Sequence, residues 1–278
     1  YQNGEIIFDR RYGSTNTFEK NNYPVGYNLG QSGNTPSQNL VDAYEMIDGT
    51  PFDWNNPEHK SNPYANRDPR LAMSILTNNV EFKDRTIEAW TGGRDGKGVI
   101  HATRTGYYIY KFIDPNLDLL QNRTSVHHWV IMRYAEILLS YAEAMNEAYG
   151  PTGNVGYRLN AVRALNQVRN RVGVEMPAVP TAISKEELRE KIRNERRVEL
   201  AFEDHRFWDV RRWMIAEQEG VMSGAMYGIK IYWINSSPQE FRYTPYLYEN
   251  RTFTKKMYLH PFSTNEVNKG YLIQNPGY

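Results

Sequence analysis

The chain has 278 residues, a length that suits one large or two small domains. With 40% hydrophobic and 23% charged residues it can form a packed core, so the composition excludes a chain that is disordered as a whole. Its 33 basic and 32 acidic residues nearly cancel, which argues against a dedicated nucleic-acid-binding protein. The lack of cysteine excludes disulfides, thiolate catalysis and zinc–thiolate or iron–sulfur sites. Aromatic residues make up 13% of the chain, a composition typical of surface proteins that handle polar ligands such as sugars.

Residues 1–125 are rich in glycine, asparagine, proline and tyrosine, and breakers such as Gly92-Gly93 separate short apolar runs. This texture predicts long ordered loops with small strands, two of them over residues 99–102 and 107–110. The apolar run over residues 5–8 predicts an extended segment with nothing before it to pair with. We therefore expect that an N-terminal portion of the protein is missing from this sequence.

Apolar residues follow a helical period in the middle of the chain. They recur three and four residues apart over 131–145 and again over 161–172, which predicts two helices. Ser184 followed by Glu187 predicts a capping box at the start of a third helix, which runs to about residue 203.

A fourth helix is predicted over residues 206–216, so residues 126–217 would form two antiparallel helix pairs. Small residues at the expected crossings favour tetratricopeptide-type hairpins, although the full repeat consensus is not met. Residues 218–278 return to loops and aromatic residues. The sequence therefore predicts a mainly α chain in which helix hairpins pack against an irregular, loop-rich region with small β pieces.

Motifs for common catalytic and phosphate-binding sites are absent or incomplete. The sequence has no nucleophile elbow and no H-E-x-x-H. The glycine-rich run over residues 92–98 lacks the first glycine and the final serine or threonine of a phosphate-binding loop, so it predicts a turn. Asp114 begins a D-x-N-x-D run, but Leu119 stands where an EF-hand needs glycine. The sequence thus indicates no metal site and no cofactor, and leaves open whether a structural calcium ion braces the loops.

Two glutamates, Glu195 and Glu199, fall on the apolar stripe of the third predicted helix, within about 40° of Leu188. One interpretation is the acid–base pair of a glycoside hydrolase. The other is a buried structural pair, neutralised by arginines of the same stretch, residues 193–212. Adjacent guanidinium groups lower a carboxyl pKa, which does not suit a general acid that must stay protonated. We favour the structural interpretation.

Aromatic residues in the loops are candidate ligand contacts. Sugar rings stack on aromatic planes, while Asn, Asp and Arg side chains bond the sugar hydroxyls. For each ring the alternative role is core packing. The candidates from the sequence are Phe18, Tyr23, Tyr27, Trp54 and Trp90, in a wider set of loop aromatics that also contains Tyr107, Tyr108 and Trp233.

The segment NERRVELAFEDHRFWDVRRW, residues 194–213, strongly resembles the signature of the SusD/RagB family. Further family-like segments occur in family order, so the resemblance covers nearly all of the chain, as the C-terminal half of a family member. These segments are TPSQNLVDAYEMIDG (35–49), NRDPRL (66–71), TGYYIYKF (105–112), MRYAEILLSYAEA (132–144) and LIQNPGY (272–278).

The resemblance implies a non-catalytic protein on the outer face of the outer membrane, held there by an N-terminal lipid anchor that this chain does not include. Such a protein binds an oligosaccharide or polysaccharide and delivers it to a TonB-dependent, SusC-like transporter. The resemblance also implies that residues 1–278 form one SusD-like C-terminal region: ligand-facing loops over 1–125, helix hairpins over 126–217 and loops over 218–278. The N-terminal repeat helices would be missing.

Similar proteins often place sugar-stacking aromatics in the loop before the segment that matches residues 35–49. Here that loop offers Phe18, Tyr23 and Tyr27, with Asn28 as a polar neighbour. Three other functions stay open: peptide or other nutrient binding on the same fold, as in RagB-like proteins; a hydrolase that uses Glu195 and Glu199; and a scaffold for the transporter without ligand contacts in this half.

Overall fold

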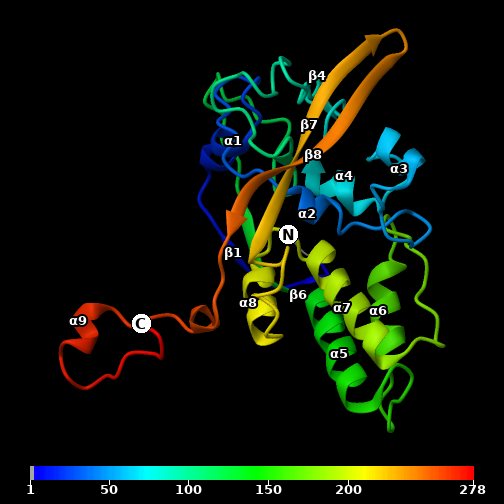
Figure 1. Cartoon of the computed structure of the whole chain (residues 1–278), viewed down its shortest axis with the longest axis vertical. Helices are drawn as coiled ribbons and strands as arrows, with labels where there is room; N and C mark the ends of the chain where they lie inside the picture. Colours follow the sequence, from blue (N-terminus) through cyan, green and yellow to red (C-terminus); the bar gives the residue numbers. More distant parts are fainter. Residues whose placement is uncertain (1–2) are drawn as a thin grey trace.

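The computed structural model describes residues 3–278. In Figure 1 the lower part is a group of helices, the upper part is a loop-rich region crossed by a long β-hairpin, and the C-terminal segment extends away from both as an arm. The upper region therefore combines the start of the chain with a hairpin that begins only at Gly224.

Short elements lie between the loops of the upper region. The pairs β2–β5 and β3–β4 join strands of only two residues each, and β1 pairs antiparallel with β6. The elements are β1 Ile6–Arg11, α1 Thr17–Asn22, α2 Gln38–Val41, α3 Pro57–Ser61, α4 Arg70–Ser74, β2 Ile75–Leu76, β3 Glu81–Phe82, β4 Arg85–Thr86, β5 Tyr108–Ile109 and β6 His128–Arg133. Residues 99–102 form turns instead of the expected strand, because Gly98 and His101 bend the chain with φ of +116° and +64°.

Four helices form the lower part of the molecule: α5 Tyr134–Tyr149, α6 Ala161–Arg169, α7 Lys185–Glu199 and α8 His205–Arg212. α5 packs against both α6 and α7 around fully buried residues such as Leu139, Leu165 and Leu188. The predicted capping box is confirmed, because the Ser184 and Glu187 side chains each accept the other's backbone N–H. The tetratricopeptide character of the helix pairs stays a prediction.

Helical spacing misplaced two residues of these stripes. Ile131 lies in β6, where it is 42% exposed, and α5 begins only at Tyr134. Val172 lies beyond the end of α6 and is 93% exposed. Residues 128–133 are extended because they pair with β1, which is far away in the sequence. The local spacing of apolar residues does not reveal such a distant partner, so it predicted a helix at Ile131.

The expectation of loops over residues 218–278 is wrong for the middle of that stretch. β7 Gly224–Ser236 and β8 Gln239–Arg251 form an antiparallel hairpin of two 13-residue strands. Both strands contain residues that usually interrupt strands, Gly228 and Pro245. Gly228 lets β7 approach Thr105, whose Cα would lie 2.9 Å from an added Cβ. Pro245 has no backbone N–H to donate. It is tolerated because the sheet has only two strands, so each strand has an edge that no other strand pairs with.

Two large cores and a small third cluster of Val210, Ala216 and Phe253 hold the described residues together. The upper core contains Tyr44, Tyr107 and Tyr108 and joins the loops to the hairpin through Ile231. The lower core lies among α5, α6 and α7. The arm carries only η1 Lys255–Tyr258 and α9 Thr264–Val267, so the end of the chain is loop-rich as expected. Within residues 3–278 no helix combines the length and the apolar character needed to cross a bilayer.

Candidate ligand-binding site

Tyr23 and Tyr27 are core residues, which corrects their prediction as stacking platforms. They are 2% and 7% exposed, and both rings pack edge-on against Phe82. Their hydroxyls donate to backbone carbonyls, Tyr23 to Asp114 at 2.5 Å and Tyr27 to Phe82 at 2.7 Å. Burial raises the pKa of both phenols above the ordinary value, so both remain donors. Neither ring presents a face to a ligand.

Three other predicted contacts are spread over the upper region. Phe18 is half-buried beside the His127 ring. Trp54 is half-buried, and its Nε1–H donates to Asp42 at 3.1 Å. Asn28 is exposed. Among the described residues, no ring contact joins Phe18 or Trp54 to Trp90, so these rings do not form one aromatic cluster.

Trp90 is the predicted residue that lies in an aromatic cluster on the hairpin. Its ring is 4.8 Å from Trp233 in an edge-to-face arrangement and 5.3 Å from Phe241. Trp233 on β7 and Phe241 on β8 are register partners, with ring centroids 5.7 Å apart. Trp233 remains 43% exposed. We call these three residues the aromatic platform. Trp90 and Phe241 hold the Trp233 ring in place, while part of the Trp233 ring faces solvent.

A groove of about 620 Å³ adjoins the aromatic platform and shares Phe241 with it. Its volume lies within the usual range of ligand pockets. Its walls combine an apolar ring surface with amide, hydroxyl and charged groups from α3 and β8. The lining residues are Pro57, Lys60, Ser61, Asn62, Asn79, Ile234, Gln239, Glu240, Phe241, Arg242 and Tyr243. This arrangement can stack a sugar ring and bond its hydroxyls.

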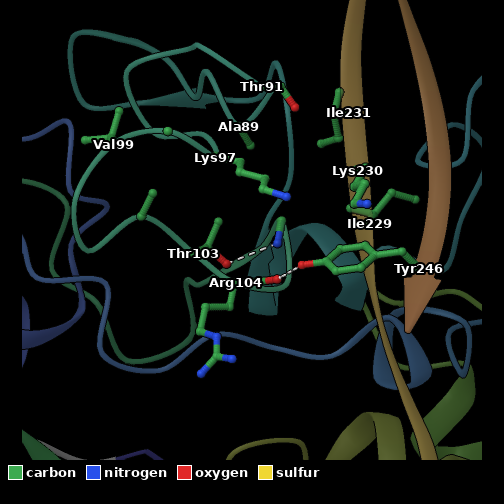
Figure 2. A pocket seen from close by; sticks show the side chains of 13 residues that line it. Ala89, Thr91, Lys97, Val99, Thr103, Arg104, Ile229, Lys230, Ile231 and Tyr246 are labelled. Carbon is green, nitrogen blue, oxygen red and sulfur yellow. Dashed lines mark hydrogen bonds between the residues drawn. The ribbon is translucent and has the colours of Figure 1, made fainter. Parts of the chain in front are cut away.

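A second hollow of about 300 Å³ lies between β7 and the loop over residues 89–106 (Figure 2). Two backbone hydrogen bonds fasten this loop to the strand, Thr91 N–H to the Ile231 carbonyl and Ile229 N–H to the Thr105 carbonyl, both 2.8 Å. We call this hollow the loop–strand cavity.

Glu195 and Glu199 are buried in an ion network, as the structural interpretation predicted. Glu195 is 2.5 Å from Arg70 and 2.7 Å from Arg169. Glu199 contacts Arg70, Arg133 and Arg171 at 2.9, 2.7 and 2.6 Å. These arginines lie outside residues 193–212, where we expected the partners. Of the expected partners, Arg196 and Arg212 instead bind Asp209, 2.8 Å away from each.

Both carboxylates are buried in the ion network, with 1% of Glu195 and 3% of Glu199 exposed, so neither can reach a substrate. Burial by itself would raise the pKa of Glu199, but Arg133, Arg171 and Arg70 outweigh it and lower that pKa to about 2. A general acid must be protonated near neutral pH. The glycoside hydrolase hypothesis for these two residues is therefore wrong.

Two members of the aromatic platform were not among the residues selected from the sequence. Trp233 belonged only to the wider set of loop aromatics, and Phe241 was missed. The alternation of Phe241 and Tyr243 along β8 was the available signal, since alternate residues share one face of a strand. The aromatic platform depends on the register of the β7–β8 hairpin. Because we expected loops over residues 218–278, this register could not be predicted. Within residues 3–278, no group of three His, Asp or Glu residues is arranged to hold a metal ion.

Comparison with known proteins identifies relatives along nearly the whole chain. Residues 4–278 match the family described as "SusD family". A crystal structure of a SusD-like protein from Bacteroides fragilis is 31% identical, with a TM-score of 0.80, over 99% of this chain and 55% of its own. A second, described as a SusD-like carbohydrate binding protein from the same species, is 28% identical, with a TM-score of 0.76, over 96% of this chain and 53% of its own.

Among curated proteins, SusD-like protein P2 from Formosa agariphila is 35% identical over 111 residues, which are 38% of this chain and 20% of that protein. The chain thus spans about half the length of the solved structures that it matches, and the match to this curated relative covers a fifth of it.

Proposed function

Because this chain belongs to the SusD family, we propose that it is part of a non-catalytic, glycan-binding protein of the outer cell surface. The aromatic platform would hold an oligosaccharide or polysaccharide by stacking on Trp233, and the adjoining groove would bond its hydroxyls. Stacking contributes affinity, and the placement of hydrogen bonds contributes specificity.

The exposed, immobilised ring of Trp233 is the observation that carries the proposal. Trp90 and Phe241 hold this ring at 4.8 and 5.7 Å, so little rotamer entropy is lost when a sugar stacks on it. A structural relative described as carbohydrate binding supports the same ligand class.

The finer parts of the proposal concern the whole protein. We expect the whole protein to deliver its ligand to a TonB-dependent, SusC-like transporter and to be held at the outer membrane by a lipid anchor. We also expect the packed pairs α5–α6 and α5–α7 to serve as tetratricopeptide-type scaffolding, away from the ligand.

Peptide binding is the alternative function on the same fold. A groove of about 880 Å³ is lined by acidic residues and by Pro51, Pro180 and Ile183, which would suit a basic peptide. Its carboxylates are in part already engaged, for example Glu45 with Arg169 and Lys191 at 2.9 and 2.7 Å. Trp233 in the aromatic platform is 43% exposed and therefore open to a ligand, which supports a glycan over a peptide.

Calorimetric titration of the protein against a panel of oligosaccharides and peptides tests the proposal, with Trp233→Ala beside the unmodified chain. We expect one oligosaccharide class to bind and Trp233→Ala to weaken it about tenfold or more. Trp208→Ala is the matched control, because Trp208 is 62% exposed, lies on α8 and, among the described residues, has no ring contact with the aromatic platform. Peptide binding without oligosaccharide binding, or equal losses in the two variants, would contradict the proposal.

A further inference from the structure

We propose that the loop–strand cavity is a subsite for an anionic substituent, so that the glycan carries carboxylate or sulfate groups. This inference rests on the proposed function and names the class of its ligand. The cavity of about 300 Å³ is at the small end of ligand pockets, a size suited to one sugar residue.

The charge of the cavity wall carries the inference. Lys97, Arg104 and Lys230 line the cavity, and its wall contains no Asp or Glu. In the described part of the chain, no carboxylate forms an ion pair with any of these three cations. The chain as a whole has nearly equal numbers of acids and bases, and many of its other buried or half-buried cations are paired. An unpaired group of three cations around one hollow is a strong attraction for an anion.

Two of the three cations, Lys97 and Lys230, come from opposite walls of the cavity. Figure 2 shows the Lys97 side chain reaching from the loop toward β7, which carries Lys230, while the Arg104 side chain points away from Lys97. Lys97 and Arg104 are exposed and Lys230 is half-buried. The Lys230 ammonium is 4.8 Å from the centre of the Tyr246 ring, which restricts its position. Lys97 and Lys230 are therefore the pair that would hold the anion, with Arg104 at the edge.

Three residues with hydroxyl groups are part of the cavity wall, and internal hydrogen bonds hold two of them. Thr91, Thr103 and Tyr246 line the same cavity. Thr103 Oγ1 accepts the backbone N–H groups of Thr105 and Gly106, both at 3.1 Å, and the Tyr246 hydroxyl donates to the Arg104 carbonyl. These bonds fix the wall in the unliganded protein, and such preorganisation favours binding.

A counter-charge near the cavity is already neutralised. Glu249 on β8 interacts electrostatically with Arg104, but its carboxylate contacts Arg251 at 3.1 Å. The positive charge of the cavity is therefore available to a ligand.

Titration calorimetry with two probes of equal length tests the subsite: an oligogalacturonate, or a sulfated oligosaccharide, against a neutral oligosaccharide. We expect the charged probe to bind at least tenfold more tightly than the neutral probe. Added salt should weaken binding of the charged probe and leave the affinity of the neutral probe unchanged. Replacing Lys97→Gln and Lys230→Gln together is expected to weaken the charged probe about tenfold to a hundredfold, and the neutral probe less than twofold. The control is Lys20→Gln with Lys255→Gln, which removes the same charge from two lysines without ion pairs in the described residues.

The outcomes separate this inference from the proposed function. If neutral and charged probes bind equally and the Lys97 and Lys230 variant binds both normally, the anionic subsite is refuted while glycan binding stands. If the charged probe weakens equally in the control variant, the attraction is general and the subsite is refuted. If no oligosaccharide binds, the proposed function fails and this inference fails with it. Tighter binding of the charged probe, lost only in the Lys97 and Lys230 variant, supports the subsite.

Discussion

Replacing Glu199 by glutamine tests whether the buried ion network is structural. Glu199 contacts three guanidinium groups and its side chain has no solvent exposure. Its pKa falls from the ordinary 4.5 to about 2, and at about 1.4 kcal/mol per pH unit this corresponds to about 3 kcal/mol of stability. Removing one partner of a buried ion pair costs about 3–5 kcal/mol, which agrees with this magnitude.

Urea unfolding at pH 7 measures the change. We expect Glu199→Gln to lower the free energy of unfolding by about 3 kcal/mol. Glu190→Gln is the matched control on the same helix, because Glu190 is 68% exposed and, among residues 3–278, its one ion pair is with Arg193. We expect its loss of stability to stay below about 0.5 kcal/mol. A loss below about 1 kcal/mol for Glu199→Gln would refute the reasoning.

The pH dependence of the same difference gives a second check. The folded pKa of Glu199 lies below the unfolded one, so its contribution is complete above about pH 4.5 and is lost as the pH falls toward about 2. The glutamine variant does not titrate at this position. The stability difference between the unmodified protein and Glu199→Gln should therefore shrink between pH 5 and pH 2, and a constant difference would contradict the assignment.

Two further substitutions test how the upper region is held. Tyr27→Phe keeps the ring but removes the hydroxyl that donates to the carbonyls of Phe82 and Arg85, so we expect a loss of about 1–2 kcal/mol in urea unfolding and unchanged glycan affinity. Weaker glycan binding in a fully folded variant would restore Tyr27 as a ligand contact. Gly106→Ala would put a Cβ 2.5 Å from Ile229 Cγ2 at a φ of +88°. We therefore expect the free energy of unfolding to fall by at least about 1 kcal/mol and a charged oligosaccharide to bind more weakly. A variant as stable as the parent in thermal unfolding would contradict the close approach of loop and strand.

The local signals in the sequence located the four lower helices but not all of their ends, since Ile131 and Val172 lie outside helices and α7 and α8 end at Glu199 and Arg212. α7 begins at its predicted capping box because a cap is satisfied within one turn of the chain. The position of Glu195 and Glu199 on the apolar face of α7 is enough to require arginine partners, because an unpaired carboxylate is not stable in a core. The segments that resemble the SusD/RagB family likewise identified the family over nearly the whole chain.

Only the tertiary structure decided which residues meet. The arginines that neutralise Glu199 come from α4, from the end of β6 and from beyond α6, and helical spacing contains no information about such distant partners. Tyr27 became a core residue because the carbonyls of residues 82 and 85 lie within reach of its hydroxyl. Trp90 became part of the aromatic platform because β7 and β8 pair in one particular register, and strand pairing is set by contacts far apart in sequence. The sequence by itself indicated the positions of the four lower helices, the need for buried counter-charges and the family. Only the tertiary structure showed the candidate binding surface, because it forms where the loop over residues 89–106 packs against the β7–β8 hairpin.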